Sequence, residues 1–335
     1  MKSLAQIEPR TPISSAPYTI TNPGSYYLTT NLAPNFYGIV IATNDVRVDL
    51  RGFTIAGGYI GVYFNGTYTN IQIINGTIRN CGGLGVDAYN SVSPRELLFE
   101  NLTILYNGIG SSGRGIMTRA ATVRNCTFTG NGSHGIEIQG GLIEHCVARG
   151  NTANGFEVTG DGLIRECQAD GNNSYGIDCT TSARVQNCVT ISNSVVGVRT
   201  GNDTVVTGCV ANNNGTGISV GTHCTVENCL ANNNKYYGLT PGGGCLITGN
   251  HVSGNGQGGT TGGILFVSAG PISRVENNFV RDNFGYGIFV NSSDIVLRNS
   301  SGGNTNSNYS PSSGPNFAPV QNPATATNAW GNISF

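Results

Sequence analysis

The sequence predicts an all-β fold, a parallel β-helix solenoid of about twelve rungs. One observation is a glycine followed by an apolar residue, which returns about once every 20 to 25 residues along most of the chain. The other is the short apolar–polar alternation inside each repeat, with no helical segment between repeats. A fixed period in this range is typical of stacked repeats. One position of the repeat then becomes a column of side chains, so sequence spacing maps the surface.

The repeat can be followed through most of the 335 residues. From Gly115 to Gly238 its steps are 20 or 21 residues. The pairs are Gly38-Ile39, Gly61-Val62, Gly85-Val86, Gly115-Ile116, Gly135-Ile136, Gly155-Phe156, Gly176-Ile177, Gly197-Val198, Gly217-Ile218, Gly238-Leu239, Gly263-Ile264 and Gly287-Ile288.

Each repeat reads as three short strands and three turns. After Gly135, Ile136 and Ile138 alternate with Glu137 and Gln139, which predicts a strand with one buried face. Two further short strands follow before the next repeat begins. His145 occupies a bend where other repeats have Asn, so we expect a left-handed backbone there.

Cysteine and asparagine columns follow the same period. Six cysteines are spaced by 20 or 21 residues: Cys126, Cys146, Cys167, Cys188, Cys209 and Cys229. Parallel side chains on strands roughly 4.8 Å apart hold their Cβ atoms too far apart for a relaxed disulfide, so we expect buried free thiols. An asparagine column is expected to form an amide ladder: Asn131, Asn151, Asn172, Asn193 and Asn214.

The motif apolar-x-Asn-Cys/Asn-x-apolar-x-x-Asn, followed by Gly-Ile-x-Val, resembles the right-handed parallel β-helix (pectate-lyase-like) repeat family over residues 38–300. The resemblance implies a right-handed solenoid. This family includes polysaccharide lyases, polygalacturonase-type hydrolases, alginate epimerases and phage tailspikes, so it implies no single reaction. We expect an N-terminal cap over residues 1–37, the β-helix over 38–301, and an irregular C-terminal tail over 302–335 that packs on the solenoid.

Composition limits the partners. With 17 Lys and Arg against 18 Asp and Glu, the net charge is −1, and no basic patch indicates nucleic acid. The sequence contains no run of 18 apolar residues, so we expect no membrane-spanning helix. The N-terminus lacks the apolar stretch of a signal peptide. We expect a secreted or cell-surface protein whose signal peptide is missing from this chain.

An acidic column marks the candidate site. Glu137, Glu157 and Asp178 are the outward residues of three consecutive repeats, and Arg199 follows on the fourth. Neighbouring carboxylates repel each other, which raises at least one pKa and suits a general acid beside a base or nucleophile. These three residues are the predicted catalytic group. No cofactor is required, but carboxylate oxygens also suit calcium, so the same three are a possible calcium site.

Other residues are predicted to bind substrate around this column. Arg199 would hold a substrate anion or tune the carboxylates, and His134 lies on a turn that borders the column. Longer repeats on either side predict loops near 90–95, 108–113 and 254–262 that wall a groove. The predicted substrate-binding set is Arg199, Asp87, Tyr89, Arg119, Gln139, His134 and Tyr175.

Three functions remain open from the sequence. We expect a carbohydrate-active protein that binds an extended polysaccharide in a groove on the solenoid face, as a glycoside hydrolase. One alternative is a calcium-assisted polysaccharide lyase. The other is a non-catalytic surface or structural β-helix that binds glycans or partner chains, with the carboxylates as solvated surface. An outward apolar column, Val189, Val210 and Leu230, predicts a covered face that could join copies of the chain.

Overall fold

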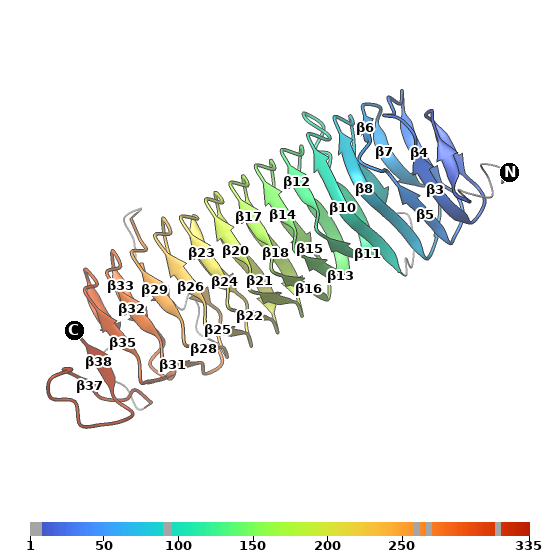
Figure 1. Cartoon of the computed structure of the whole chain (residues 1–335). Coiled ribbons are helices and arrows are strands. Elements are labelled where there is room, and N and C mark those ends of the chain that lie inside the picture. Colours follow the sequence, from blue (N-terminus) through green and yellow to red (C-terminus); the bar gives the residue numbers. More distant parts are fainter. Residues whose placement is uncertain (1–8, 90–95, 258–261, 266–269, 312–315) are drawn as a thin grey trace. The chain divides into compact units, whose positions relative to one another are not determined.

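The computed structural model describes residues 9–89, 96–257, 262–265, 270–311 and 316–335. They form a parallel right-handed β-solenoid of about 13 turns, close to the twelve rungs expected. The described residues contain strands and turns, and none of them forms a helix long and apolar enough to cross a lipid bilayer. Two compact units are distinguished, Met1–Gly162 and Leu163–Phe335. Figure 1 shows the strands of the chain coloured along the sequence.

Every rung contributes to three parallel sheets, called A, B and C here. Sheet A carries the Gly–apolar repeat, sheet B follows the first turn, and sheet C follows the left-handed bend. The bend is confirmed, because Asn125 and His145 both have φ 53. Apolar residues alternate inward on all three sheets, and those of sheet A, such as Ile136 and Ile138, are almost completely buried.

In unit 1 the three sheets lie within the blue-to-green part of Figure 1. Sheet A contains β2 (Tyr18–Ile20), β4 (Tyr37–Ile41), β7 (Ile60–Phe64), β9 (Val86–Ala88), β11 (Ile116–Arg124), β13 (Ile136–Glu144) and β15 (Phe156–Val158). Sheet B contains β1 (Thr11–Ile13), β3 (Gly24–Leu28), β5 (Val46–Asp49), the first halves of β8 (Ile71–Arg79) and β10 (Leu97–Leu105), and the second halves of β11 and β13. Sheet C contains β6 (Thr54–Ala56), the second halves of β8 and β10, β12 (Thr127–Thr129) and β14 (Val147–Arg149).

Unit 2 has the same arrangement of three sheets. Sheet A contains β18 (Tyr175–Thr181), β21 (Val196–Asn202), β24 (Thr216–Val220), β27 (Leu239–Pro241), β30 (Ile264–Leu265), β33 (Tyr286–Phe289) and β36 (Ser307–Ser310). Sheet B contains β16 (Gly162–Arg165), whose last three residues belong to unit 2, with β19 (Arg184–Gln186), β22 (Val205–Thr207), β25 (Thr225–Glu227), β28 (Leu246–Thr248), β31 (Arg274–Glu276) and β34 (Ile295–Leu297). Sheet C contains β17 (Gln168–Asp170), β20 (Val189–Ile191), β23 (Val210–Asn212), β26 (Leu230–Asn232), β29 (His251–Ser253), β32 (Phe279–Arg281), β35 (Ser300–Gly302) and β38 (Asn332–Ser334), and β37 (Val320–Gln321) pairs with β38.

The predicted asparagine ladder is present in each unit. In unit 2, the Asn193 side-chain amide donates to Asn214 Oδ1 over 2.9 Å, and the Asn193 backbone N–H donates to the same oxygen over 2.9 Å. Asn214 repeats both bonds toward Asn234. In unit 1, Asn131 donates in the same way to Asn151. Each buried amide therefore satisfies backbone and side-chain groups of adjacent rungs.

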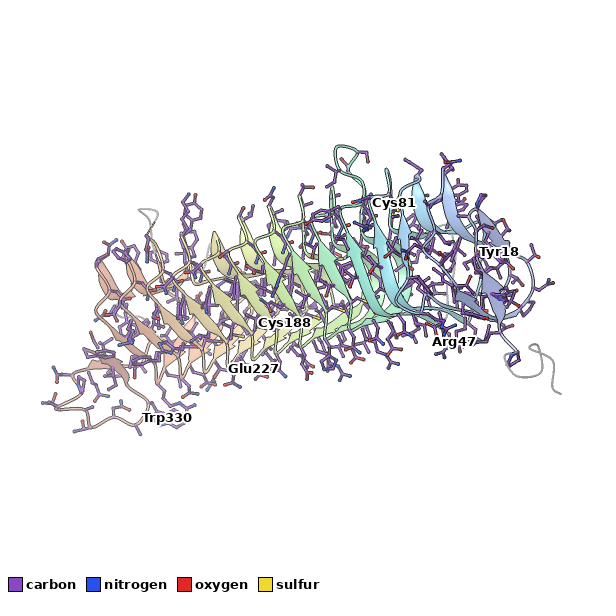
Figure 2. The ribbon with its side chains drawn as sticks, turned by 45° about the horizontal axis from the view of Figure 1, so that its top comes forward. Tyr18, Arg47, Cys81, Cys188, Glu227 and Trp330 are labelled. Carbon is purple, nitrogen blue, oxygen red and sulfur yellow. The ribbon has the colours of Figure 1, made fainter. Side chains whose placement is uncertain are left out.

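The six cysteines of the predicted column are buried free thiols, as expected, and the other four cysteines are free and buried as well. In unit 2 the thiol column runs into an asparagine column, because the Cys229 backbone N–H donates to Asn250 Oδ1 over 2.9 Å. Figure 2 labels Cys81 and Cys188 among the rungs, and it labels Arg47 and Glu227, which lie on the outer side of sheet B. The thiol side chains point into the solenoid and the charged side chains point outward, as the inward–outward alternation along each strand requires.

The terminal segments contribute strands to the stack. Within residues 1–37, β1 pairs with β3, and β2 pairs with β4. Within residues 302–335, β36 pairs with β33, and β38 pairs with β35. At the C-terminal end, the Arg298 guanidinium lies 4.7 Å from the Trp330 ring centroid, and Trp330 is labelled in Figure 2.

Candidate functional site

In unit 1, the outward residues of sheet A form one register column. Asp87 pairs with Met117, Met117 pairs with Glu137, and Glu137 pairs with Glu157. Parallel strands lie roughly 4.8 Å apart. Glu137 and Glu157 are therefore one strand spacing apart, and Asp87 and Glu137 are two apart. The part of the predicted column that lies in this unit, from Asp87 to Glu157, has the register that the repeat predicted.

Glu137 is paired with an arginine that the sequence analysis did not single out. The Arg114 Nε donates to Glu137 Oε2. Both side chains are mostly covered, with 29% and 20% of their surfaces exposed. A charged hydrogen bond of this kind fixes the orientation of the Glu137 carboxylate.

Glu157 has an amide and a histidine as neighbours. The Asn154 side-chain amide donates to Glu157 Oε2, and His134 Nδ1 lies 4.0 Å from the same oxygen. The Asn154 backbone N–H donates to His134 Nδ1 over 3.3 Å. Since Nδ1 accepts this hydrogen bond, the neutral ring carries its proton on Nε2. His134 borders the acidic column, as the sequence predicted.

Asp87 is in a different electrostatic setting. Burial raises the pKa of the Asp87 carboxyl above its usual value, while the Tyr89 backbone N–H and the Arg114 charge oppose that shift. The Tyr89 N–H donates to Asp87 Oδ1 over 3.2 Å. Arg114 thus acts on both Asp87 and Glu137. The two carboxyl groups share an arginine, but Asp87 is biased toward its protonated form.

Three of the predicted substrate-binding residues meet beside this column. The Arg119 guanidinium lies 4.7 Å from the Tyr89 ring centroid, and its Nε donates to the Tyr89 carbonyl over 3.1 Å. The Gln139 side-chain amide donates to the Tyr89 hydroxyl over 3.2 Å. Tyr89 is therefore held by two outward side chains of sheet A, and its ring is fixed at the edge of the carboxylates.

In unit 2, Asp178 is engaged by Arg199 through two hydrogen bonds. Arg199 Nε donates to Asp178 Oδ1 over 2.7 Å, and Nη2 donates to Oδ2 over 2.6 Å. Nη1 donates to the Tyr175 hydroxyl over 3.1 Å, and the guanidinium lies 4.2 Å from the Tyr175 ring centroid. Asp178 is only 1% exposed. Its carboxylate is thus an anchor for Arg199, and the roles expected of Arg199, holding a substrate anion or tuning the carboxylates, stay predictions.

A shallow groove follows the outer edge of sheet A in unit 2. A depression of about 360 Å³ is lined by Arg199, Thr180 and Ser219, among others. A second, of about 400 Å³, shares Ser219 with it and reaches Thr240. At the equivalent turn of unit 1, an open depression of about 420 Å³ is lined in part by Glu96, Ala121 and Gly141. Their open form suits an extended ligand.

The sequence analysis missed Arg114 and Asn154. Both immediately precede the glycine of their repeat, the position by which His134 was noticed, so that column was the available signal. Among the described residues, no group of three or more His, Cys, Asp and Glu side chains is arranged to hold a metal ion. The expected loop at 90–95 and part of that at 254–262 lie outside the described residues.

The apolar column of sheet C is in register within unit 2. Val189 pairs with Val210, and Val210 pairs with Leu230. The column continues to Phe279, whose ring stacks on Phe335 with centroids 5.8 Å apart. The chain terminus therefore covers one end of the column. Self-association through Val189, Val210 and Leu230 stays a prediction.

The fold and its register define a class of protein. The chain belongs to the right-handed β-helix region family, whose model matches residues 37–189 and 118–245. That range contains the whole acidic column. Comparison with curated proteins finds no match.

Solved structures of similar fold include the A-module of the Azotobacter vinelandii mannuronan C-5 epimerase AlgE4. It has a TM-score of 0.50 and 17% identity, over 97% of this chain and 90% of that chain. The periplasmic alginate epimerase AlgG matches with a TM-score of 0.48 and 13% identity, over 76% of this chain and 72% of that one. Pectate lyase Pel9A has a TM-score of 0.35 and 14% identity, over 91% and 70%. At 17% identity the likeness to the AlgE4 A-module shows the fold alone.

Proposed function

We propose that this chain acts on an extended polysaccharide outside the cell and cleaves it as a glycoside hydrolase. The observation that carries the proposal is the in-register pair Asp87 and Glu137, two strand spacings apart on the outer face of sheet A. Two spacings are roughly 9.5 Å, near the upper end of the carboxyl separation of inverting glycosidases. The pair also offers two different electrostatic settings, which is how one site provides an acid and a base.

Asp87 is the proposed general acid. Burial raises its pKa, so a proton is available for the glycosidic oxygen that leaves. Glu137 is the proposed general base, because the Arg114 guanidinium orients its carboxylate on the same outer face of sheet A as Asp87. It takes a proton from the water that attacks the anomeric carbon. The bond from that carbon to the leaving oxygen breaks as the bond to water forms. Proton exchange with solvent then restores both carboxyl groups.

Glu157 is one strand spacing from Glu137, and with Asn154 and His134 it extends the polar surface along the polymer. In the retaining alternative, Glu157 and Glu137 would be the reacting pair, since roughly 5 Å is the separation of retaining enzymes. The stereochemistry of the first product distinguishes the two, and NMR of the anomeric proton during early turnover would read it.

A polysaccharide lyase is the second candidate, and the contacts of Arg199 favour it. Arg199 touches the Tyr175 hydroxyl beside a groove. There it could face the carboxylate of a uronic acid. In β-elimination the Tyr175 oxygen would take the proton from C5 and pass it to O4, as the C4–O4 bond breaks and the C4–C5 double bond forms. The calcium site expected from the sequence at Glu137, Glu157 and Asp178 adds no support to this route. The three carboxylates accept hydrogen bonds from Arg114, Asn154 and Arg199, and the described residues contain no group of three or more His, Cys, Asp and Glu side chains arranged to hold a metal ion.

A polysaccharide panel with and without calcium tests the proposal. Alginate, polygalacturonate and α- and β-glucans are incubated with the wild type, Asp87→Asn, Glu137→Gln and Arg199→Met, and reducing ends and unsaturated ends are read together. We expect reducing ends without unsaturation, lost in Asp87→Asn and Glu137→Gln. Unsaturated ends lost in Arg199→Met would support the lyase. No product on any polymer would contradict both enzymes and favour a glycan-binding or structural β-helix.

A further inference from the structure

The aromatic platform, as it is called here, consists of four side chains from the first two Gly–apolar rungs of unit 1. Tyr37 and Tyr63 lie on strands β4 and β7 of sheet A, and Phe36 and Tyr59 lie on the turns that precede these strands. The Phe36 and Tyr59 rings are stacked with centroids 5.3 Å apart and an interplanar angle of 22°. Tyr37 and Tyr63 are stacked at 4.7 Å and 9°. Phe36 also meets Tyr37 edge-on at 4.5 Å. The four rings therefore support one another in a fixed arrangement.

Two rings of the platform are open to solvent. Phe36 is 53% exposed and Tyr59 is 46% exposed. Backbone bonds hold this turn in register, because the Tyr59 N–H donates to the Phe36 carbonyl over 2.7 Å and the Gly83 N–H donates to the Tyr59 carbonyl over 2.8 Å. The third rung has Gly83 where the first two have aromatic residues. A Cβ at Gly83 would lie 3.0 Å from Tyr59 Cε2, so the Tyr59 ring extends over that rung.

The platform is continuous with the acidic column. Tyr63 pairs with Asp87 in the strand register, so the last ring of the platform is one strand spacing from the proposed acid. The positions that hold Tyr37 and Tyr63 in the first two rungs hold Arg114 and Glu137 in later ones. One outer face of sheet A thus changes from uncharged aromatic to charged along the rungs of unit 1.

We propose that the aromatic platform is a sugar-binding subsite that stacks pyranose residues of a polysaccharide whose chain continues to Asp87 and Glu137. A pyranose presents a face of C–H groups to an aromatic ring and hydroxyls at its edge, which the tyrosine hydroxyls can meet. The rings are rigid and supported, so binding orders few side chains. The platform rings contact the uncharged face of the sugar. Charged groups of the polymer would be contacted by the rungs that follow, which carry Asp87 and Glu137. The inference rests on the proposed function for the choice of a polysaccharide, but binding is measured separately from cleavage.

Affinity electrophoresis tests the subsite. Native gels are cast with alginate, polygalacturonate or hydroxyethylcellulose, and Glu137→Gln serves as the parent so that the polymer stays intact. The double substitution Phe36→Ala and Tyr59→Ala is introduced into this parent. It should raise the dissociation constant for the polymer that retards the parent roughly tenfold, as loss of an aromatic hot spot does. Tyr59→Phe keeps the ring and should bind like the parent. Tyr106→Ala is the matched control, since Tyr106 is a tyrosine of unit 1 that is 49% exposed with its ring against Gly130.

Each outcome decides the inference. Equal retardation of the parent and the double alanine variant would overturn it, and so would a parent that none of the three polymers retards. If the variant changes the sedimentation coefficient and not the retardation, the platform joins copies of the chain and the inference fails. If binding is lost with the rings while the wild type cleaves nothing, the subsite stands and the proposed hydrolase falls.

Discussion

The Arg199 guanidinium holds the buried Asp178 carboxylate with two hydrogen bonds, Nε to Oδ1 at 2.7 Å and Nη2 to Oδ2 at 2.6 Å. Such a planar pair orients the arginine as well as neutralising the acid. Its third nitrogen is then directed at the Tyr175 hydroxyl, 3.1 Å away. The position of Arg199 in unit 2 is therefore set by an acid that has little contact with solvent.

Replacing Arg199 with methionine should destabilise unit 2. The substitution keeps much of the apolar stem and removes the partner of a buried charge, so we expect the free energy of unfolding to fall by about 2 kcal/mol. Urea unfolding measures it, and adding Asp178→Asn should recover part of the loss. Arg47→Met is the control, since Arg47 is exposed and bonds Gln72. An equal loss for both arginines would contradict the expectation.

The asparagine ladder should be costly to interrupt. Asn214→Ala removes the oxygen that accepts from the Asn193 backbone and side chain, and the amide that donates to the Thr190 carbonyl over 3.1 Å. We expect a loss of about 3 kcal/mol, because buried groups of two rungs lose their partners. Thermal unfolding compares it with Asn213→Gly, an exposed neighbour with φ 57 where glycine is tolerated. Similar melting temperatures would show that the ladder contributes little.

Stability should fall at alkaline pH. Burial raises the pKa of the Cys81 thiol from 9.0 to about 12. In the unfolded chain this thiol ionises near pH 9, so between about pH 9 and 12 the unfolded state binds fewer protons than the folded state. The contribution of this thiol to the free energy of unfolding is fully present below pH 9. It falls by about 1.4 kcal/mol per pH unit between pH 9 and 12. Unfolding under reducing conditions from pH 8 to 11 measures it. Cys81→Ala should show a shallower decline, and an unchanged slope would refute the assignment.

The pH–rate profile should report the proposed acid. Burial raises the pKa of Asp87, and a general acid works only when protonated, so cleavage should decline as the pH rises through that pKa. Asp87→Asn should lower kcat by roughly a hundredfold or more and remove the alkaline limb. A substrate with a good leaving group should recover part of the rate in this variant only, and Glu137→Gln serves as the comparison. If the alkaline limb of the pH–rate profile persists in Asp87→Asn, it reports the titration of another group and contradicts Asp87 as the acid.

The apolar column offers a test of self-association. Leu230→Glu places a charge among the outward residues of sheet C that include Val210. If copies of the chain meet there, sedimentation velocity should show a smaller species for the variant than for the wild type at the same concentration. Thr225→Glu is the control, because Thr225 is an outward residue of sheet B. Identical sedimentation of the wild type and Leu230→Glu would exclude this face.

Register was predictable from the sequence because a fixed period decides which side chains meet. The step of 20 between Glu137 and Glu157 placed them on adjacent strands, and the structure pairs them. The asparagine and cysteine columns followed for the same reason. The burial of an outward side chain by the side chains next to it was not predictable. Alternation directs Asp178 outward, yet Arg199 bonds its carboxylate, the Tyr175 ring packs on that guanidinium, and Asp178 is only 1% exposed.

The partners of the site were harder to predict than its columns. Arg114 reaches Glu137 from a turn that precedes its strand. Turns have no period of two, so the pattern does not say where a turn side chain points. Asn154 was missed for the same reason, although it contacts Glu157. The platform residue Phe36 also lies on a turn, and its contact with Tyr59 depends on ring orientation.

The amide ladder also restricts how such a chain can change its length. In unit 2, Asn193, Asn214 and Asn234 each accept from the rung before and donate to the rung after. An insertion of a few residues within a strand would leave two amides out of step, whereas a complete extra rung would restore the pattern. Growth or shrinkage by duplication and deletion is therefore tolerated in whole repeats, and smaller length changes are confined to the turns.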